Sequence, residues 1–207
     1  MEIKDSGERR EFKTGAVRDI GEGKGRCDLL PLDILAPIMP KQEYANILHQ
    51  IYSFMQSGDV EFLYLAIASF AIENEWTVSK MILEVSVQYE EGAEKYGEHN
   101  WERGIPLHCY LDSAIRHFLK FVDGQQDEPH NRAYIWNLLG AIWTYKNLPD
   151  MVDIYFPKKP ESTESEDSTE EGLRESLTTS ENLSDLASVL SSMDPNTTVG
   201  EVLASLN

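Results

Sequence analysis

The sequence has 207 residues and a formal net charge of −18, from 36 acidic and 18 basic residues. This excess of carboxylates argues against a nucleic-acid coat and against a protein that binds anionic membranes, because both need clustered positive charge. The two cysteines, Cys27 and Cys109, form no CxxC pair, and the longest apolar run, residues 62–72, is too short to cross a bilayer. We therefore expect a soluble cytoplasmic protein with no nucleic-acid or membrane partner.

Residues 1–41 are interpreted as an N-terminal arm that contains the glycine-rich stretch GAVRDIGEGKGR. Its GEGKG segment is not a phosphate-binding P-loop, because Gly25 stands where a serine or threonine should follow the lysine. A solvated loop is the simpler interpretation. The arm nevertheless carries Arg18, Lys24 and Arg26, an unusual basic cluster in an acidic protein.

The middle of the chain, residues 42–156, has the apolar spacing of helices and no sustained alternation typical of strands. Polar or Gly/Pro-containing breaks separate most of the candidate segments. The spacing predicts helices over residues 42–55, 60–74, 77–96, 107–122 and 128–146. The fold class is therefore all-α, a helical bundle.

Residues 157–207 form an acidic tail of low complexity, which has too few apolar residues to offset the entropy of ordering and is expected to be disordered. Residues 181–207 regain an apolar pattern that suits one or two short amphipathic helices. The tail is either a weakly helical, solubilising appendage or a docking element.

Carboxylates accompany the apolar face of the third predicted helix. Its expected core stripe consists of Ile82, Val85, Tyr89, Ala93 and Tyr96. Glu90 and Glu94 lie on the flank of this stripe, one turn apart, so the two carboxylates can converge on a cation. The alternative is a solvated acidic flank.

The apolar stripe of the fifth predicted helix continues toward its N-terminus through Asn131 and Glu128. Helix capping explains Asp127 and part of Glu128. Inward contact with a metal or substrate is the other interpretation, and oxygen ligands there suit Mg²⁺ or Mn²⁺ rather than Zn²⁺. By contrast, Asp112 and Arg116 have the spacing of an intrahelical ion pair, and each histidine, taken singly, is more often a surface residue than a ligand.

Four stretches carry a family resemblance: GAVRDIGEGKGRCDLLP, YEEGAEKYGEHNWERGIP, LDSAIRH and DEPHNRAYIWNLL. They resemble the phage-associated dATP/dGTP diphosphohydrolase N-terminal domain family, which is grouped with the MazG-like all-α nucleotide pyrophosphohydrolases. The resemblance covers residues 12–36 and 80–145, and residues 40–79 look like a helical insertion. If a phage encodes the chain, the expected location is the host cytoplasm.

The resemblance implies a metal site. The MazG-like pattern EExxE matches Glu90, Glu91 and Glu94, and the pattern ExxD is similar to Glu128 through Asn131, with Asn in place of Asp. It implies Mg²⁺ (or Mn²⁺) held by Glu90, Glu94, Glu128 and Asn131, with Glu91 or Glu94 accepting the proton of the attacking water. Asp127 or Asn137 would contribute in another register.

The resemblance also implies the reaction, which is hydrolysis of dATP or dGTP to the monophosphate and pyrophosphate. The expected phosphate contacts are Lys95, Arg116, Arg18, Lys24 and Arg26. Tyr96, Asn100 and Trp101 are candidates for base and sugar recognition, and Asn137 is a further candidate substrate contact. The alternatives are a catalytically weak member that binds a nucleotide or a partner, and a diphosphohydrolase for another nucleotide. A homo-oligomer, dimer or tetramer, is expected by the same resemblance.

Overall fold

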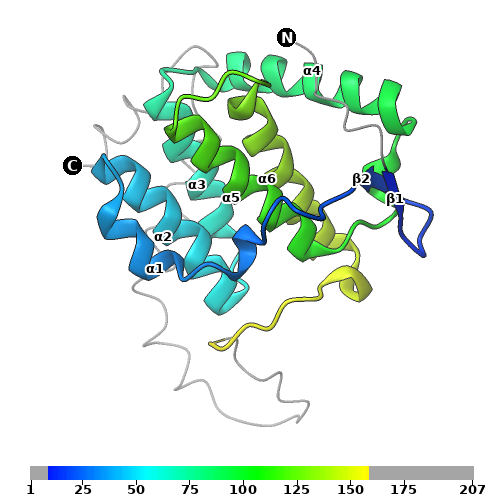
Figure 1. Cartoon of the computed structure of the whole chain (residues 1–207), viewed down its shortest axis with the longest axis horizontal. Helices are drawn as coiled ribbons and strands as arrows, with labels where there is room; N and C mark the ends of the chain where they lie inside the picture. Colours follow the sequence, from blue (N-terminus) through cyan, green and yellow to red (C-terminus); the bar gives the residue numbers. More distant parts are fainter. Residues whose placement is uncertain (1–8, 159–207) are drawn as a thin grey trace, which may run out of the picture.

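Five long helices lie where the apolar spacing predicts them. The computed structural model describes residues 9–158 (Figure 1). The long helices are α2 (Gln42–Ser57), α3 (Glu61–Glu73), α4 (Val78–Tyr96), α5 (Leu107–Val122) and α6 (His130–Asn147). The all-α prediction is confirmed. The disorder and short helices expected in the tail lie outside the described residues.

Helix α6 begins two residues later than the sequence predicts, and proline explains the difference. Its first residue is His130, and Pro129 precedes it with φ −77° and ψ 77°, outside the helical region. A residue before proline is driven away from the helical region, which keeps Glu128 out of the helix. Asp127 and Glu128 therefore lie in the α5–α6 loop, ahead of the first turn of α6.

The arm contains a small hairpin that the sequence pattern did not predict. Strands β1 (Arg9–Glu11) and β2 (Val17–Asp19) pair antiparallel, with Arg10 opposite Arg18. Three-residue strands are too short to produce a readable alternation. The arm continues through 3₁₀ turns at Cys27–Leu29 and Ala36–Ile38 and the short helix α1 (Leu32–Leu35).

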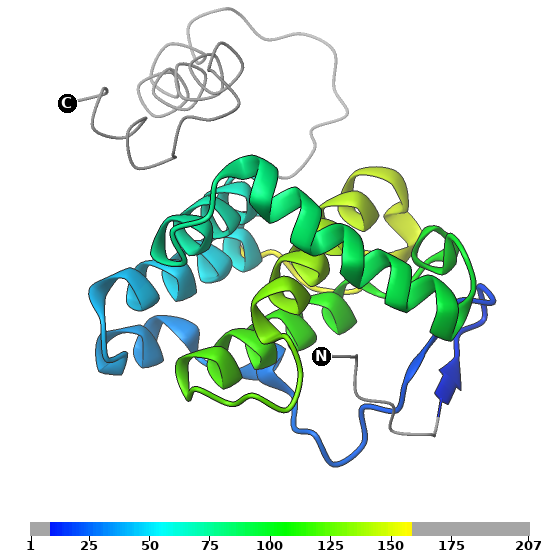
Figure 2. The same ribbon diagram turned by 90° about the horizontal axis from the view of Figure 1, so that it is seen from above.

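Helices α5 and α6 form the centre of the bundle, with α2 and α3 packed beside them (Figure 1). Aromatic rings fill the junction, where Phe70 lies 4.5 Å from Tyr134 between ring centroids and Phe118 lies 5.6 Å from Tyr134. Helix α4 crosses the bundle on one side, and its C-terminal end approaches the β1–β2 hairpin (Figure 2). A space therefore opens between the hairpin, α4 and the α5–α6 pair.

The apolar stripe predicted for α4 is wrong at one position. Val85 is buried and Tyr89 packs against the core, but Ile82 is 58% exposed and its neighbour Leu83 is 67% exposed. The inward face runs instead through Val85, Gln88 and Tyr89. This rotation changes which carboxylates face the bundle. Within residues 9–158, no helix combines the length and apolar character needed to cross a membrane.

Gly140 is required where α6 meets α5. A Cβ added there would lie 2.3 Å from Cε1 of the fully buried Tyr110. Gly140→Ala is therefore expected to lower the free energy of unfolding by about 1–3 kcal/mol, because overpacking outweighs the better helix propensity of alanine. Gly92→Ala in α4 is the matched control, since its Cβ meets nothing within 4 Å. Denaturant titration compares the two, and equal stabilities would contradict this packing.

His108 at the start of α5 ties down the segment that follows α6. Its Nδ1 contacts Asp153, and its Nε2 lies 3.2 Å from Cys109 Sγ. The hydrogen bond to Cys109 and the contact with Asp153 raise the pKa of His108 to about 9. A raised pKa stabilises the fold fully below the unfolded value of 6.5, and this stabilisation disappears as pH rises through about 9.

Replacing His108 with glutamine should therefore lower thermal stability at pH values below 6.5 and have a shrinking effect above about 9. The expected difference is about 0.5–1 kcal/mol, since the ion pair is partly exposed. His99→Gln is the matched control, because His99 pairs with Glu102 on the surface. A constant difference between wild type and His108→Gln across the pH series would contradict the assignment.

Candidate functional site

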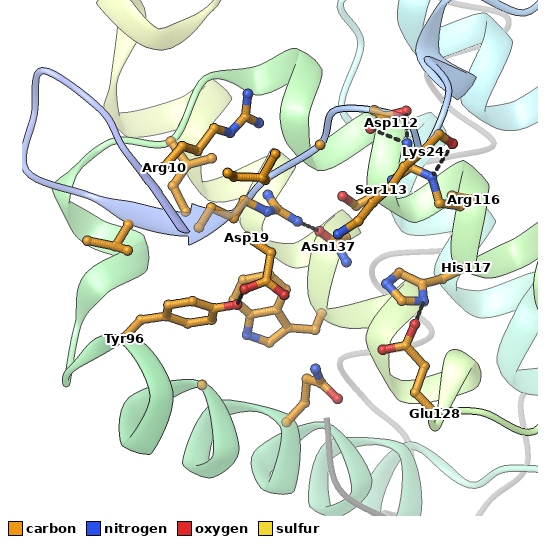
Figure 3. A pocket seen from close by; sticks show the side chains of 18 of the residues that line it. Arg10, Asp19, Lys24, Tyr96, Asp112, Ser113, Arg116, His117, Glu128 and Asn137 are labelled. Atoms are coloured by element: carbon orange, nitrogen blue, oxygen red, sulfur yellow. Dashed lines mark hydrogen bonds and ion pairs between the residues drawn. The ribbon is translucent and has the colours of Figure 1, made fainter. Parts of the chain in front are cut away.

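A pocket of about 400 Å³ lies between the arm, α4, α5 and the start of α6 (Figure 3). Its volume falls within the range of small-molecule sites. The arm contributes Arg18, Asp19 and Lys24, and α5 contributes a polar row that includes Arg116 and His117. Charged groups of both signs thus face one hollow, as a site for a phosphorylated ligand requires.

Arg116 fixes the glycine-rich loop over this pocket. Its guanidinium donates hydrogen bonds to both oxygens of Asp112 at 2.5 Å, which confirms the predicted intrahelical ion pair. The same guanidinium donates to the carbonyls of Lys24 and Gly25 at 3.3 and 2.9 Å. Asp112 in turn accepts from the backbone N–H of Cys27 at 2.7 Å. The pair therefore acts as a clamp on the loop.

The loop places Lys24 at the pocket. Its side chain extends into the hollow (Figure 3), and it forms no ion pair with any other part of residues 9–158. Partial burial lowers the pKa of Lys24, while the carboxylates of Asp19 and Glu128 raise it. The ammonium group is thus a cation placed in the pocket, and no carboxylate of residues 9–158 forms an ion pair with it.

Strand β2 forms one wall, and three of the predicted substrate contacts hold it in place. Lys95 Nζ lies 2.8 Å from one oxygen of Asp19, and the Tyr96 hydroxyl donates to the other at 2.7 Å. Burial and the contact with Asp19 raise the pKa of Tyr96 to about 12. Asn100 exchanges two hydrogen bonds, of 2.7 and 2.8 Å, with the backbone of Val17. Tyr96 and Asn100 also line the pocket.

Aromatic rings and an amide position Arg18 at the back of the pocket. Its guanidinium carbon lies 5.0 Å from the ring centroid of Tyr110 and 5.7 Å from that of Trp136. It also donates a hydrogen bond to Oδ1 of Asn137, which is 2% exposed. Arg18 and Asn137, both predicted contacts, are thereby brought together.

Two histidines and a glutamate meet at the other end of the pocket. Nδ1 of His117 lies 3.1 Å from Nδ1 of His130, and Oε1 of Glu128 lies 3.7 and 3.6 Å from these two nitrogens. Within the described part of the chain, these three residues are the group with metal-ligand spacing. Burial and the positive neighbours His130, Arg18 and Lys120 lower the pKa of His117 to about 3.

Asp127 and Lys120 contact members of this cluster. Oδ1 of Asp127 lies 2.8 Å from Nε2 of His130, and its Oδ2 lies 3.2 Å from Nζ of Lys120. Nζ of Lys120 is also 3.6 Å from Oε1 of Glu128. The predicted ligands Asp127 and Glu128 therefore lie together, but their close partners are histidines rather than the carboxylates of α4.

The carboxylates predicted on α4 do not join them. Glu90 and Glu94 are exposed, about 160° around the helix from the pocket-lining row Gln88, Gly92 and Tyr96. Glu91 faces inward but binds Arg132, with 2.5 Å between Oε1 and Nη2. These side chains are thus separated from Glu128, because the helix is rotated relative to the predicted stripe.

Three other predicted residues lie elsewhere. Asn131 accepts a hydrogen bond from the backbone N–H of Arg132 at 2.8 Å and does not line the pocket. Trp101 packs edge-on against Trp143, with 4.9 Å between ring centroids, beside a second hollow of about 260 Å³. Arg26 forms a bidentate pair with Asp28, whose hydrogen bonds raise the pKa of Arg26.

These elements can be compared with known families. Residues 70–153 match the family dATP/dGTP diphosphohydrolase, N-terminal. The match spans α4, α5, α6 and the segments that connect them, which together supply most of the residues that line the pocket, and confirms the resemblance over this part of the chain. It does not extend to residues 12–36, the other stretch of the predicted resemblance. No curated protein and no solved structure matches the chain.

Sequence reasoning missed His117, His130 and Gln88. A signal for His117 was available, since Ser113, His117 and Lys120 form a polar row on one face of α5, and all three line the pocket. His130 follows Asp127 by three residues, but the two lie on either side of a proline. Gln88 is 8% exposed and lines the pocket, and its Oε1 has no hydrogen-bond partner within residues 9–158.

Proposed function

We propose that the chain hydrolyses the purine deoxynucleoside triphosphates dATP and dGTP to the monophosphate and pyrophosphate, in the pocket beneath the glycine-rich loop. The observation that carries this proposal is the ammonium group of Lys24, which lines the pocket, forms no ion pair with the described residues and faces the cluster containing Glu128. The family match of residues 70–153 supports the substrate class.

The phosphates are assigned to the end of the pocket between the loop and the cluster. Lys24 and Lys120 face this space and supply positive charge where negative charge develops during phosphoryl transfer. Arg116 is committed to Asp112 and the loop carbonyls, so its role is to position Lys24. The predicted phosphate contact Arg116 is thereby reassigned as a positioning residue.

The base is assigned to the opposite end of the pocket, where apolar rings and unused polar atoms are available. Trp136 lines this end, and Arg18 lies against it. The amide of Gln88 offers a buried oxygen with no partner in the described chain, which suits the hydrogen-bonding edge of a purine. A site that hydrogen-bonds its ligand in this way discriminates against analogues that lack the matching groups.

Glu128, His117 and His130 fit a divalent cation, since all three offer lone pairs within one small space. When bound, such an ion supplies Lewis-acid polarisation of phosphoryl oxygens and neutralises part of their charge. Proton abstraction from the attacking water is assigned to Glu128, which lines the pocket, because Lys95 and Tyr96 occupy both oxygens of Asp19. Glu91 is less suited to this role because Arg132 occupies its Oε1.

Incubation with single nucleotides tests the proposal. The full chain is mixed with each deoxy- and ribonucleoside triphosphate in the presence of Mg²⁺, Mn²⁺ or Co²⁺, and the products are separated by ion-exchange chromatography. Monophosphate and pyrophosphate from dATP or dGTP are the expected products. Binding without turnover would favour a non-catalytic member, and release of a nucleoside or of single phosphates would contradict this reaction type.

We further propose that the chain self-associates through α4. Val78, Ile82 and Leu83 are 39%, 58% and 67% exposed on this helix, and covering such side chains removes apolar surface from water. Light scattering should give a mass that is a multiple of 23.5 kDa. Ile82→Glu should shift that mass toward a single chain, and an unchanged mass would place the contact elsewhere.

A further inference from the structure

We propose that His117, Glu128 and His130 bind one divalent ion of the borderline class, such as Zn²⁺ or Co²⁺, in preference to Mg²⁺. The catalytic use of this ion rests on the proposed function. Binding itself rests on the geometry of the three side chains, two of which are only 16% exposed and the third 2%.

The spacing of the donor atoms fits one ion. Their separations are 3.1, 3.6 and 3.7 Å. Two donors on a tetrahedral ion with bonds of about 2.0–2.2 Å stand about 3.3–3.6 Å apart. The three donors thus surround a point at bonding distance from each, and the side of the cluster toward the pocket is available for solvent or a phosphate oxygen.

The hydrogen bond to Asp127 prepares His130 as a ligand. Ionised carboxylates only accept hydrogen bonds, so Nε2 of His130 donates to Oδ1 of Asp127 across 2.8 Å. In the neutral ring, Nδ1 then carries the lone pair, and this is the atom that faces His117 and Glu128. Metal-bound histidines almost always donate their second N–H to such a carboxylate or carbonyl.

The donor types select the class of ion. Two of the three donors are imidazole nitrogens, which suit Zn²⁺ and Co²⁺, whereas Mg²⁺ and Mn²⁺ prefer oxygen ligands and Mg²⁺ requires a near-ideal octahedron. Two carboxylates, Asp127 and Glu128, lie at this cluster beside the ammonium of Lys120, and Glu128 is itself one of the three donors.

The cluster also has an interpretation without an ion. Nδ1 of His117 can donate a hydrogen bond to Nδ1 of His130, which accepts it through its lone pair, and the cluster would then only fasten the start of α6 to α5. The two interpretations differ in a measurable way. A hydrogen-bonded cluster binds no metal, whereas a ligand set holds one ion per chain in a defined coordination.

Metal binding is therefore measured directly, without nucleotide. The full chain is stripped with a chelator, dialysed against Co²⁺ in an excess of Mg²⁺, and its metal content is determined by mass spectrometry. One Co²⁺ per chain is expected, together with visible absorption bands stronger than those of the hydrated ion. Histidine coordination is read independently from the paramagnetically shifted proton signals of the imidazole rings.

Variants assign the site. His117→Gln and His130→Gln should each abolish the shifted signals of one ring, and Asp127→Asn should weaken Co²⁺ binding by about 10- to 100-fold through loss of the second-sphere carboxylate. His49→Gln, which removes an exposed histidine of α2, is the matched control. Circular dichroism establishes that each variant is folded.

The proposal is overturned if the folded wild type binds no Co²⁺, or if binding survives both histidine variants. Loss of binding in Glu90→Gln or Glu94→Gln, with the histidine variants unaffected, would also overturn it, in favour of the α4 carboxylates. The proposed function fails separately. If the chain binds the ion through His117 and His130 but hydrolyses no nucleotide, the metal site is supported and the proposed hydrolase activity is contradicted.

Discussion

Replacing Glu91 with leucine is expected to lower the free energy of unfolding by about 3 kcal/mol, because it removes one partner of a largely buried ion pair. Its Oε1 lies 2.5 Å from Nη2 of Arg132, and the two side chains are 19% and 8% exposed. The pair joins α4 to α6, and its loss leaves the guanidinium buried without this carboxylate. Urea denaturation followed by circular dichroism measures the change.

Two matched variants isolate the pair. Glu90→Leu removes the neighbouring, exposed carboxylate and should change stability by less than about 0.5 kcal/mol. The double variant Glu91→Leu with Arg132→Met should recover part of the lost stability, since apolar side chains of similar size often replace buried ion pairs at little cost.

A second substitution, Glu91→Gln, separates two roles for Glu91. The family resemblance assigns it to proton transfer, whereas its contact with Arg132 assigns it to the joining of two helices. If Glu91 only joins the two helices, Glu91→Gln keeps a hydrogen-bond acceptor for Arg132 and should retain most of the hydrolytic activity. If Glu91→Gln has wild-type stability but no activity, the result contradicts the structural role of Glu91 and supports its role in proton transfer.

The helices of this chain could be predicted because each buries a stripe of apolar residues long enough to show its period. Helix α5 was predicted with its observed bounds, Leu107–Val122. The β1–β2 hairpin could not be predicted, since three residues per strand give no period to detect. Its position depends on contacts distant in sequence, such as the hydrogen bonds between Asn100 and Val17.

The face of α4 was harder to predict than its length. Ile82 and Leu83 are apolar but exposed, while Gln88 is polar but buried, so hydrophobicity alone rotates the expected stripe. The predicted and observed faces differ by about 50°, half of the 100° between successive residues, and this turns Glu90 and Glu94 from the flank of the core to the outside. The prediction of their role therefore depended on an angle that the sequence does not determine.

The site itself was only partly predictable. The arm's Arg18 and Lys24 stood out because basic residues are rare in this acidic chain, and both line the pocket. His117 and His130 did not stand out, because each is isolated in its own helix and they are 13 positions apart. The α5–α6 loop, which ends at Pro129, brings their rings together, with 5.4 Å between centroids, and no local pattern in the sequence indicates that contact.

Replacing Lys24 with methionine is expected to lower kcat/KM for dATP or dGTP by about 100-fold, the usual cost of removing one preorganised charge from a phosphoryl-transfer site. The loop carbonyls of Lys24 and Gly25 remain bound to Arg116, so the backbone should keep its position. Methionine keeps a side chain of similar length and removes only the ammonium group. Steady-state assays with pyrophosphate detection provide the measurement.

Stability distinguishes this effect from a structural one. Partial burial lowers the pKa of Lys24, so the folded state holds this proton less tightly than the unfolded chain, and the charge opposes folding. Lys24→Met should therefore unfold at the same temperature as wild type or a higher one while losing activity. Lys13→Met, at an exposed position in the same arm, is the matched control and should retain the wild-type activity and unfolding temperature. If Lys24→Met hydrolysed nucleotides at the wild-type rate, the phosphates would have to bind outside this pocket, and the assignment of the glycine-rich loop would be wrong.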